Sequence, residues 1–275
     1  MTTTNLLSLL SDQGWAVFPL VDAGPVDTAR DSILMLLREL TGWSAITLET
    51  YHEYLDDDDT HFAVQKDIAA HARKHGFAKE ILLGQLELFQ AVLGPDICMT
   101  TTNNWRIARP NKTQDNIGFH RDIEVGHTAF ELNLWFPLVD VDEASAMKVM
   151  SGSHQMSRER FPFNKVDHPA ITRGSDMNKL GFMYATQIYD PWFKPQMMPV
   201  PMTVGQGLMF LTPVMHGQEV NLGSVTRWAT DFVIANSLAP IDWVHHGEEP
   251  KYEIVTESPT MKVGKLFHDF PYKSS

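Results

Sequence analysis

In the stretch FELNLWF at residues 130–136, every second side chain is large and apolar: Phe130, Leu132, Leu134 and Phe136. The residues between them are Glu131, Asn133 and Trp135. Successive side chains of a β-strand point to opposite faces, so this alternation predicts a strand with one apolar and one more polar face. The stretches GLMFL at 207–211 and WATDFVI at 228–234, and the Thr- and Met-rich segment 97–107, indicate further strands. Short strands separated by Gly and Pro turns favour an antiparallel sandwich or barrel.

Residues 1–96 have a helical pattern instead. Gly24-Pro25 followed by Asp27 is typical of a helix start, and apolar residues at 33, 36, 37 and 40 follow with helical spacing. The four aspartates at 56–59 predict an acidic turn or cap before another helix, and the leucine-rich stretch 82–93 predicts a helix that Gly94-Pro95 ends. We expect one domain over 1–275, with a mostly helical brace at 1–96 packed on a β core at 97–240.

Composition excludes several classes of function. The 275 residues carry a formal net charge of −12, which repels the phosphates of nucleic acids and acidic membranes. The apolar runs are far shorter than the roughly 20 residues of a membrane span. A single cysteine, Cys98, excludes an intramolecular disulfide and cysteine-rich metal sites, and no secretory signal is recognisable. We expect a cytoplasmic protein that acts on a small molecule, with its oligomeric state left open.

The stretch Phe119-His120-Arg121-Asp122 carries the candidate chemistry. In an extended segment His120 and Asp122 present an imidazole and a carboxylate on one face. His216, 96 positions downstream after an apolar strand, can supply a third ligand. Two histidines and one carboxylate form a facial triad that leaves coordination positions open, as in non-haem Fe(II) sites that activate O₂. A His-x-Asp pair alone is common, and a structural histidine is its more frequent explanation.

Arg227 changes that balance. It lies eleven residues after His216, across an expected turn at 221–224, so a hairpin would place it beside the metal ligand on the neighbouring strand. A buried arginine needs a carboxylate partner, which its planar guanidinium binds in a bidentate manner. The distal carboxylate of 2-oxoglutarate has a suitable reach.

These residues resemble the phytanoyl-CoA dioxygenase (PhyH-like) family of Fe(II)/2-oxoglutarate-dependent oxygenases. The matching pieces cover most of residues 14–235 in order and spacing: Gly14-Trp15-Ala16-Val17, His120-Arg121-Asp122, Trp135-Phe136-Pro137-Leu138, Gly152-Ser153-His154, His216-Gly217 with Asn221, and Arg227 followed by Asp231-Phe232. The resemblance implies a double-stranded β-helix, a cupin-like jelly roll, as the mainly β core with flanking helices. It also implies Fe(II), 2-oxoglutarate and O₂ as cofactors, His120, Asp122 and His216 as metal ligands, and Arg227 as the anchor of 2-oxoglutarate.

Two positions depart from the family pattern. Ser151 replaces a frequent proline before Gly-Ser-His, and Ala229 replaces a frequent Ser or Asn two residues after the arginine. Another side chain must then complete the 2-oxoglutarate or substrate contacts. Asn133 is the first candidate, and Asn104 and Arg106 in the preceding strand follow.

Three further features complete the expectations. The cluster Arg106, Arg109, Lys112 and Arg121 is either a solvated loop face or a positive patch that attracts dianionic 2-oxoglutarate. His127 could reach the site or the substrate, but we expect a loop histidine without partners. The long stretch 161–201, rich in aromatic, Met, Pro and Gly residues, reads as a lid loop over the substrate.

The first hypothesis is thus an Fe(II)/2-oxoglutarate-dependent oxygenase that hydroxylates, or otherwise oxidises, a small polar metabolite of secondary metabolism, releasing succinate and CO₂. The second is a jelly-roll metal-dependent hydrolase or isomerase without oxygen chemistry, which would not need Arg227. A third is a non-catalytic ligand-binding relative, against which the complete triad argues.

Overall fold

The computed structural model describes residues 2–165, 186–188, 191–244 and 250–270. Its main sheet has seven antiparallel strands in the order β1-β9-β4-β11-β2-β12, and β3 also pairs with β11. A smaller sheet has the order β10-β5-β8, and a third pairs β6 with β7. The strands of the main sheet are β1 (Trp15–Pro19), β2 (Ile97–Thr100), β3 (Asn104–Ala108), β4 (Glu131–Pro137), β9 (Gln206–Leu211), β11 (Arg227–Asn236) and β12 (Tyr252–Ile254). The others are β5 (Lys148–Val149), β6 (Phe163–Lys165), β7 (Thr186–Ile188), β8 (Met198–Pro199) and β10 (His216–Gly217).

The two faces of the main sheet differ as the sequence alternation predicts. In β4, Leu132, Leu134 and Phe136 enter the large apolar core shared with the helices. The alternate residues Asn133 and Trp135 face the other way, opposite β11 residues Val233 and Asp231 in the register. The inner face of β4 and β11, which Arg227 shares by the same alternation, therefore carries the polar side chains.

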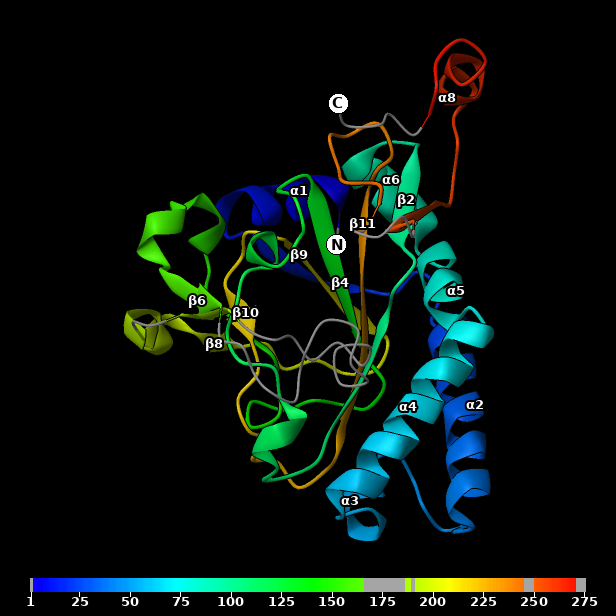
Figure 1. The fold of residues 1–275 in the computed structure, drawn as a ribbon, viewed down its shortest axis with the longest axis vertical. Helices are drawn as coiled ribbons and strands as arrows, with labels where there is room; N and C mark the ends of the chain where they lie inside the picture. Colours follow the sequence, from blue (N-terminus) through cyan, green and yellow to red (C-terminus); the bar gives the residue numbers. More distant parts are fainter. Residues whose placement is uncertain (1, 166–185, 189–190, 245–249, 271–275) are drawn as a thin grey trace.

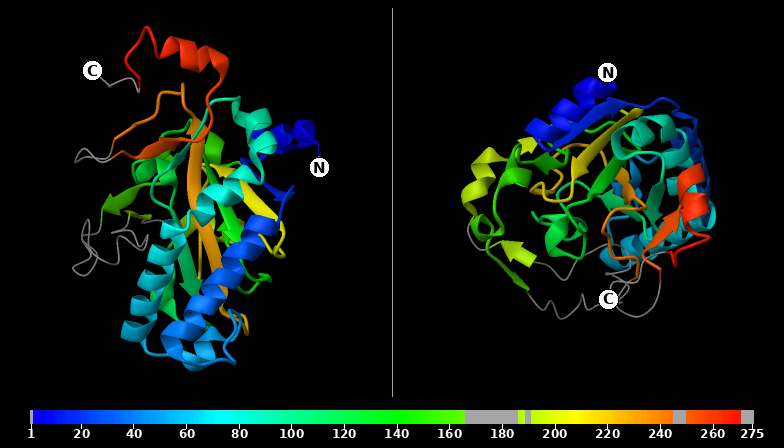
Figure 2. Two further views of the ribbon diagram at one scale, coloured as in Figure 1. Left: turned by 90° about the vertical axis from the view of Figure 1, so that its right-hand side faces the viewer. Right: turned by 90° about the horizontal axis from the view of Figure 1, so that it is seen from above.

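The helices cover the apolar face. Helices α2 (Gly24–Thr41), α4 (Asp58–Lys74) and α5 (Phe77–Leu83) bury apolar side chains in the core and run alongside the long strands (Figure 1; Figure 2, left). The small sheet lies on the opposite side of the main sheet from these helices (Figure 1). The remaining helices are α1 (Thr3–Asp12), α3 (Tyr51–Tyr54), α6 (Leu86–Leu93) and α8 (Pro259–Gly264).

The expected fold class, a mainly β jelly roll with flanking helices, is confirmed. The helix after the aspartate run begins where predicted, because the Asp57 carboxylate accepts the backbone N–H of Thr60 at 2.8 Å as its N-cap. The helix expected at 82–93 is instead broken between α5 and α6. Its break lies at Gly84 and Gln85, and the Gln85 side-chain amide binds the Asp22 carbonyl at 2.5 Å.

The strand boundaries extend beyond the expected β core. Strand β1 comes from the region expected to be helical, and β12 lies past residue 240. The serine that departs from the family pattern has a packing role, since the Trp15 indole donates to Ser151 Oγ at 2.9 Å. This bond ties the first strand to the turn before Gly-Ser-His.

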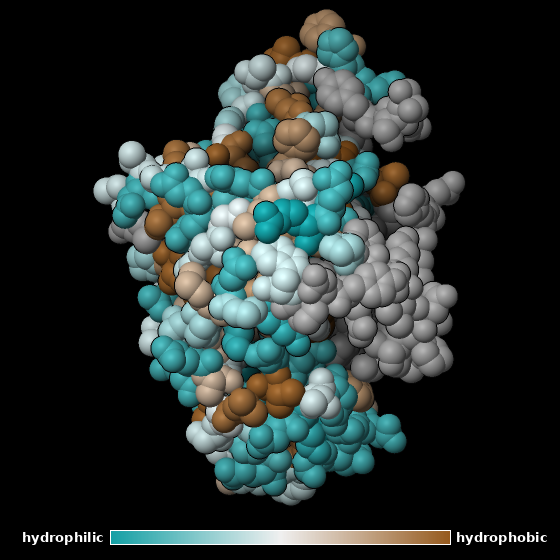
Figure 3. All heavy atoms as spheres, turned by 90° about the vertical axis from the view of Figure 1, so that its left-hand side faces the viewer, coloured by the Kyte–Doolittle hydropathy of each residue, from teal (hydrophilic) through white to brown (hydrophobic). Residues whose placement is uncertain are grey.

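The part of the surface seen in Figure 3 is mostly hydrophilic, and hydrophobic residues occur on it in small groups. No helix in the described ranges is long and apolar enough to cross a membrane.

Most of the expected lid at 161–201 lies outside the described residues. Of its described part, Phe161, Phe193 and Met197 are buried in a small cluster with Met150 and Met215. The lid role of this stretch stays a prediction.

Candidate metal centre

Two histidines from distant parts of the chain meet through their backbones. His120 and His216 form an isolated antiparallel bridge, in which the His120 N–H donates to the His216 carbonyl at 2.8 Å and the reverse bond measures 3.0 Å. The bridge brings their ring centroids to 4.3 Å. Asp122 follows two residues after His120, at the start of a short 3₁₀ turn (Asp122–Glu124). The chain thus delivers two imidazoles and one carboxylate to one place.

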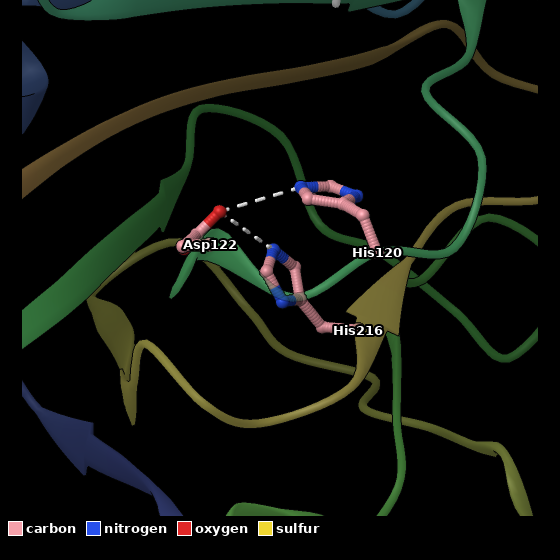
Figure 4. A group of neighbouring side chains, drawn as sticks. All are labelled: His120, Asp122 and His216. Atoms are coloured by element: carbon pink, nitrogen blue, oxygen red, sulfur yellow. Dashed lines mark ion pairs between the residues drawn. The ribbon is translucent and has the colours of Figure 1, made fainter. Parts of the chain in front are cut away.

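The ligand atoms converge (Figure 4). Asp122 Oδ1 lies 3.4 Å from His120 Nε2 and 3.8 Å from His216 Nε2, and the candidate ligand atoms of the three residues all lie within 4.8 Å of one another. This is the one group of three or more His, Cys, Asp or Glu in the described ranges that could hold a metal ion.

The surroundings orient each ligand. His120 Nδ1 lies 2.8 Å from the Gly118 carbonyl, and His216 Nδ1 lies 3.0 Å from the Val214 carbonyl. Each Nδ1 therefore carries the proton, and each Nε2 presents its lone pair to the centre. Asp122 Oδ2 accepts a hydrogen bond from Asn133 Nδ2 at 2.8 Å, which leaves Oδ1 facing the histidines.

The electrostatics keep the donors in their metal-binding forms. Burial lowers the pKa of His216 to about 4, against the opposing charge of Asp122, so its imidazole is neutral near pH 7. Burial alone would raise the pKa of Asp122, but the proximity of His216, and after it that of His120, outweighs burial and lowers that pKa, so the carboxylate is ionised. Two imidazoles and a carboxylate on one side suit a divalent transition metal such as Fe(II).

Arg227 is buried, with a 1% exposed fraction, and is bound to neutral acceptors. Its Nη1 donates to the Ser145 carbonyl at 2.7 Å, and its Nη2 donates to the Asn116 amide oxygen at 3.2 Å and to the Gln218 amide oxygen. Burial, reinforced by the charge of Arg106, lowers its pKa to about 9, so the guanidinium remains charged at pH 7. Within the described residues it has no carboxylate partner in an ion pair.

The expected hairpin between His216 and Arg227 is wrong. His216 lies in β10 of the small sheet, where it pairs with Val149, whereas Arg227 begins β11 of the main sheet. The chain passes from one sheet to the other between them. The two sites are linked by Gln218, which follows His216 by two residues and accepts from Arg227.

The three further cofactor candidates have partners within the protein. Asn133 binds Asp122, while Asn104 Nδ2 and Arg106 Nε bind the two Asp231 carboxylate oxygens at 2.6 and 2.5 Å. Asp231 was not singled out as a site residue in the sequence, although its spacing from Arg227 places both on one face of β11. That Asn133, Asn104 and Arg106 contact 2-oxoglutarate stays a prediction.

Two observations on the same inner face support a ligand there. Asn133 Oδ1 and Trp135 Nε1 are buried and have no hydrogen-bond partner among the described residues. Arg106 stands directly opposite Ala229 in the register of β3 and β11, where the family often has a polar side chain. A polar ligand would satisfy the two unpaired atoms.

Three members of the basic cluster are paired within the protein, whereas the fourth, Arg121, is buried with its guanidinium 4.9 Å from the Phe161 ring centroid. Arg109 is fully buried and bound to Asp115 and Asp58, and Lys112 pairs with Asp56. Arg106 pairs with Asp231. The acidic run at 56–59 thus neutralises part of this cluster, which the sequence spacing could not reveal.

Comparison with known proteins agrees with this geometry. The sequence profile described as Phytanoyl-CoA dioxygenase (PhyH) matches residues 15–229, a range that includes the triad and Arg227. A search of curated proteins finds no match.

Several solved structures share the fold. The apo form of the non-haem monooxygenase ThoJ has a TM-score of 0.58 at 15% identity, over 93% of this chain and 85% of that chain. The α-ketoglutarate-dependent epimerase SnoN from nogalamycin biosynthesis has a TM-score of 0.52 at 17% identity, over 93% and 98%. The carbocyclase SnoK from the same biosynthesis has a TM-score of 0.53 at 17% identity, over 93% and 99%. At such identities the likeness concerns the fold alone.

Proposed function

The chain belongs to the phytanoyl-CoA dioxygenase family, and from this premise we propose that it is an Fe(II)/2-oxoglutarate-dependent oxygenase that oxidises an unactivated C–H bond of a small polar metabolite. Its cofactors are those of the family: Fe(II), 2-oxoglutarate and O₂. SnoN, whose fold is similar, has been captured with Fe³⁺ and α-ketoglutarate. When bound, this group supplies an oxidant for C–H bonds, with succinate and CO₂ as co-products.

The residues of this chain have separate tasks. His120, Asp122 and His216 hold the metal from one side and leave the remaining positions to ligands. Asn133 holds the second oxygen of Asp122 and so directs the first toward the metal. Arg227 binds the distal carboxylate of 2-oxoglutarate through its guanidinium. The apolar and Met-rich walls around the centre exclude water from the reaction.

One observation carries this proposal beyond metal binding. Arg227 is a buried cation whose described partners are all neutral, and it is joined through Gln218 to the strand of a metal ligand. A buried charge without a counter-charge is costly, so the arrangement favours a site completed by an anion. A metal-dependent hydrolase or isomerase would have no use for such an arginine.

We propose hydroxylation as the outcome, with a substrate of secondary metabolism. The similar folds belong to a monooxygenase, an epimerase and a carbocyclase, so one architecture serves several outcomes. The net charge of −12 favours a small-molecule substrate over nucleic acid or a membrane, and a cytoplasmic location is part of the same proposal.

The deciding experiment adds Fe(II) and then 2-oxoglutarate to the protein without oxygen. We expect a weak visible charge-transfer band, and succinate after O₂ is admitted. The Asp122→Ala protein should give neither, while it keeps the circular dichroism of the wild type. Substrate hydrolysis that depends on metal but not on O₂ or 2-oxoglutarate would favour the hydrolase instead.

A further inference from the structure

A second buried carboxylate lies near the metal centre. Glu131 is fully buried at the start of β4, and both of its oxygens are bound. Oε1 accepts the Thr128 N–H at 2.7 Å and the Thr128 hydroxyl at 2.9 Å. Oε2 accepts the Tyr252 hydroxyl at 2.5 Å and a hydrogen bond from the His127 ring. His127 is therefore not a loop histidine without partners.

These bonds fix the loop that begins at the metal ligand. The backbone N–H groups of Val125 and His127 donate to the Asp122 carbonyl at 3.0 and 3.3 Å. The segment 122–131, here called the ligand loop, is thus closed on Asp122 at one end and on the Glu131 carboxylate at the other. A shift of Glu131 would be transmitted to Asp122 through a few hydrogen bonds.

The ligand loop also holds the segment that leads to the second histidine. Thr212 is fully buried, and its hydroxyl donates to the Thr128 carbonyl at 2.6 Å. The Ile123 N–H donates to the Thr212 carbonyl at 3.4 Å. Since Thr212 precedes His216 by four residues, one network joins the approaches to two of the three ligands.

The C-terminal strand completes the network from outside the family match. Lys251 and Tyr252 lie beyond residue 229, where that match ends. Lys251 is buried, and its Nζ donates to the Gly126 carbonyl of the ligand loop at 2.6 Å and lies 3.9 Å from Glu131 Oε1. Tyr252 begins β12, which pairs with β2, and the carbonyl of Lys251 just before it accepts the Thr101 N–H at 2.9 Å.

We propose that Glu131 is a positioning residue for the metal centre and that Tyr252, the first residue of β12, and its neighbour Lys251 hold it there. The network fixes the ligand loop so that the Asp122 carboxylate meets the two imidazoles. This inference rests on the proposed function, because it assigns the three residues as ligands. Positioning groups around metal ligands typically change metal affinity about 10–100-fold when they are removed.

The test uses Co(II) as a spectroscopic probe of the oxygen-free full-length protein. Glu131→Gln should weaken Co(II) binding by about 10–100-fold in calorimetry, and Tyr252→Phe, which removes one hydroxyl, by about tenfold or less. Both variants at saturating Co(II) should show a shifted visible absorption, because the ligand geometry has changed. A merely structural role would lower the melting temperature and leave that absorption unchanged.

The matched control is Glu253→Gln, on the same strand. Glu253 is partly exposed and pairs with Lys79 at 2.8 Å, not with a residue of the network, so this variant should bind Co(II) like the wild type. If Glu131→Gln does not fold, the Co(II) affinity and absorption of Tyr252→Phe alone test the proposal. Wild-type affinity and absorption in Tyr252→Phe and in any folded Glu131→Gln would overturn the positioning role while the proposed function stands. A wild-type protein that binds no Co(II), or binds it equally well after Asp122→Ala, would overturn the metal assignment itself.

Discussion

Arg109 and Arg227 are both buried and lie close together, since Arg227 pairs in the sheet with Ala108, the neighbour of Arg109. Arg109 has a complete set of partners. Its Nε and Nη2 each lie 2.9 Å from an oxygen of Asp115, and Nη2 lies 2.7 Å from Asp58. Its Nη1 donates to backbone carbonyls of the loop before α4.

Arg227 has only neutral acceptors among the described residues. The difference separates a structural arginine from one suited to an external anion. Asp115 is close enough to raise the pKa of Arg227 slightly against the lowering by burial, yet its oxygens are bound to Arg109. A buried cation balanced by carboxylates cannot be removed without leaving those carboxylates uncompensated, whereas one without them is stabilised when an anionic ligand binds.

The largest effect should come from Arg109→Met. The substitution leaves Asp115 buried without its counter-charge. We therefore expect the free energy of unfolding to fall by about 3–5 kcal/mol, nearer the larger value. Denaturant titration of the metal-free protein measures this loss. The 2-oxoglutarate affinity of the protein that remains folded should not change. A fully stable Arg109→Met protein would mean that the two arginines do not differ as described.

The matched substitution Arg227→Met should have the opposite pattern. It removes the bidentate bonds to the distal carboxylate, which we expect to cost about 3–5 kcal/mol of binding, or roughly two to three and a half decades of 2-oxoglutarate affinity. The substitution leaves neutral acceptors unpaired but no buried charge uncompensated, so the unfolding free energy should fall by less than in Arg109→Met. Calorimetric titration into the metal-loaded, oxygen-free protein checks the first expectation.

Arg227→Lys supplies an internal check on the same comparison. It keeps the charge but loses the planar fork, so its affinity should fall between those of the wild type and Arg227→Met. Unaltered 2-oxoglutarate binding by Arg227→Met would show that the co-substrate is held elsewhere.

The sequence predicts much of the fold because local patterns encode it. The alternation at 130–136 identifies β4 and its inner face, and the apolar spacing after Gly24 identifies α2. The break at Gly84 is not predicted, because it depends on Gln85 contacting Asp22 more than sixty residues away. Strand β12 is missed for a similar reason, since its pairing partner β2 is remote in sequence.

The candidate site, too, could be predicted from the sequence only in part. Residue type and order identify the triad and Arg227, because metal ligation and carboxylate binding require specific side chains. The partners of Arg227, such as Gln218 and Asn116, are common polar residues without a motif. The predicted hairpin was wrong because eleven residues suffice either for a turn within one sheet or for a crossing between two sheets. Only the tertiary structure distinguishes these.

The cluster around Arg109 should also make stability depend on pH. His61 is buried beside it, with Nδ1 2.9 Å from the Tyr51 hydroxyl and Nε2 3.6 Å from Asp115. Burial lowers the pKa of His61 from 6.5 to about 4. Below pH 6.5 the unfolded chain therefore binds a proton that the folded protein does not, so stability falls as the pH falls.

Between pH 8 and pH 5 this one group should remove about 2 kcal/mol of stability. Asn at position 61 does not titrate. The loss of unfolding free energy between pH 8 and pH 5 should therefore be about 2 kcal/mol smaller in His61→Asn than in the wild type. Denaturant titrations of both proteins at pH 8, 6.5 and 5 give the comparison. Parallel curves for the two proteins would assign the acid sensitivity to other groups.

The smallest effect should come from Ala229→Ser. By strand alternation position 229 shares the face of Arg227, and Arg106 stands opposite it in β3. A new hydroxyl can donate to the carboxylate that Arg227 binds, which is worth about 0.5–1.5 kcal/mol, or roughly a two- to tenfold gain in 2-oxoglutarate affinity. The gain should vanish in the Arg227→Met background, because the carboxylate is then no longer held beside position 229. A loss of affinity in Ala229→Ser would instead show that the Arg106 guanidinium needs the space above Ala229. One added donor can therefore improve ligand binding at Arg227. The site at Arg109 offers no such gain, because Asp115 and Asp58 already bind its guanidinium.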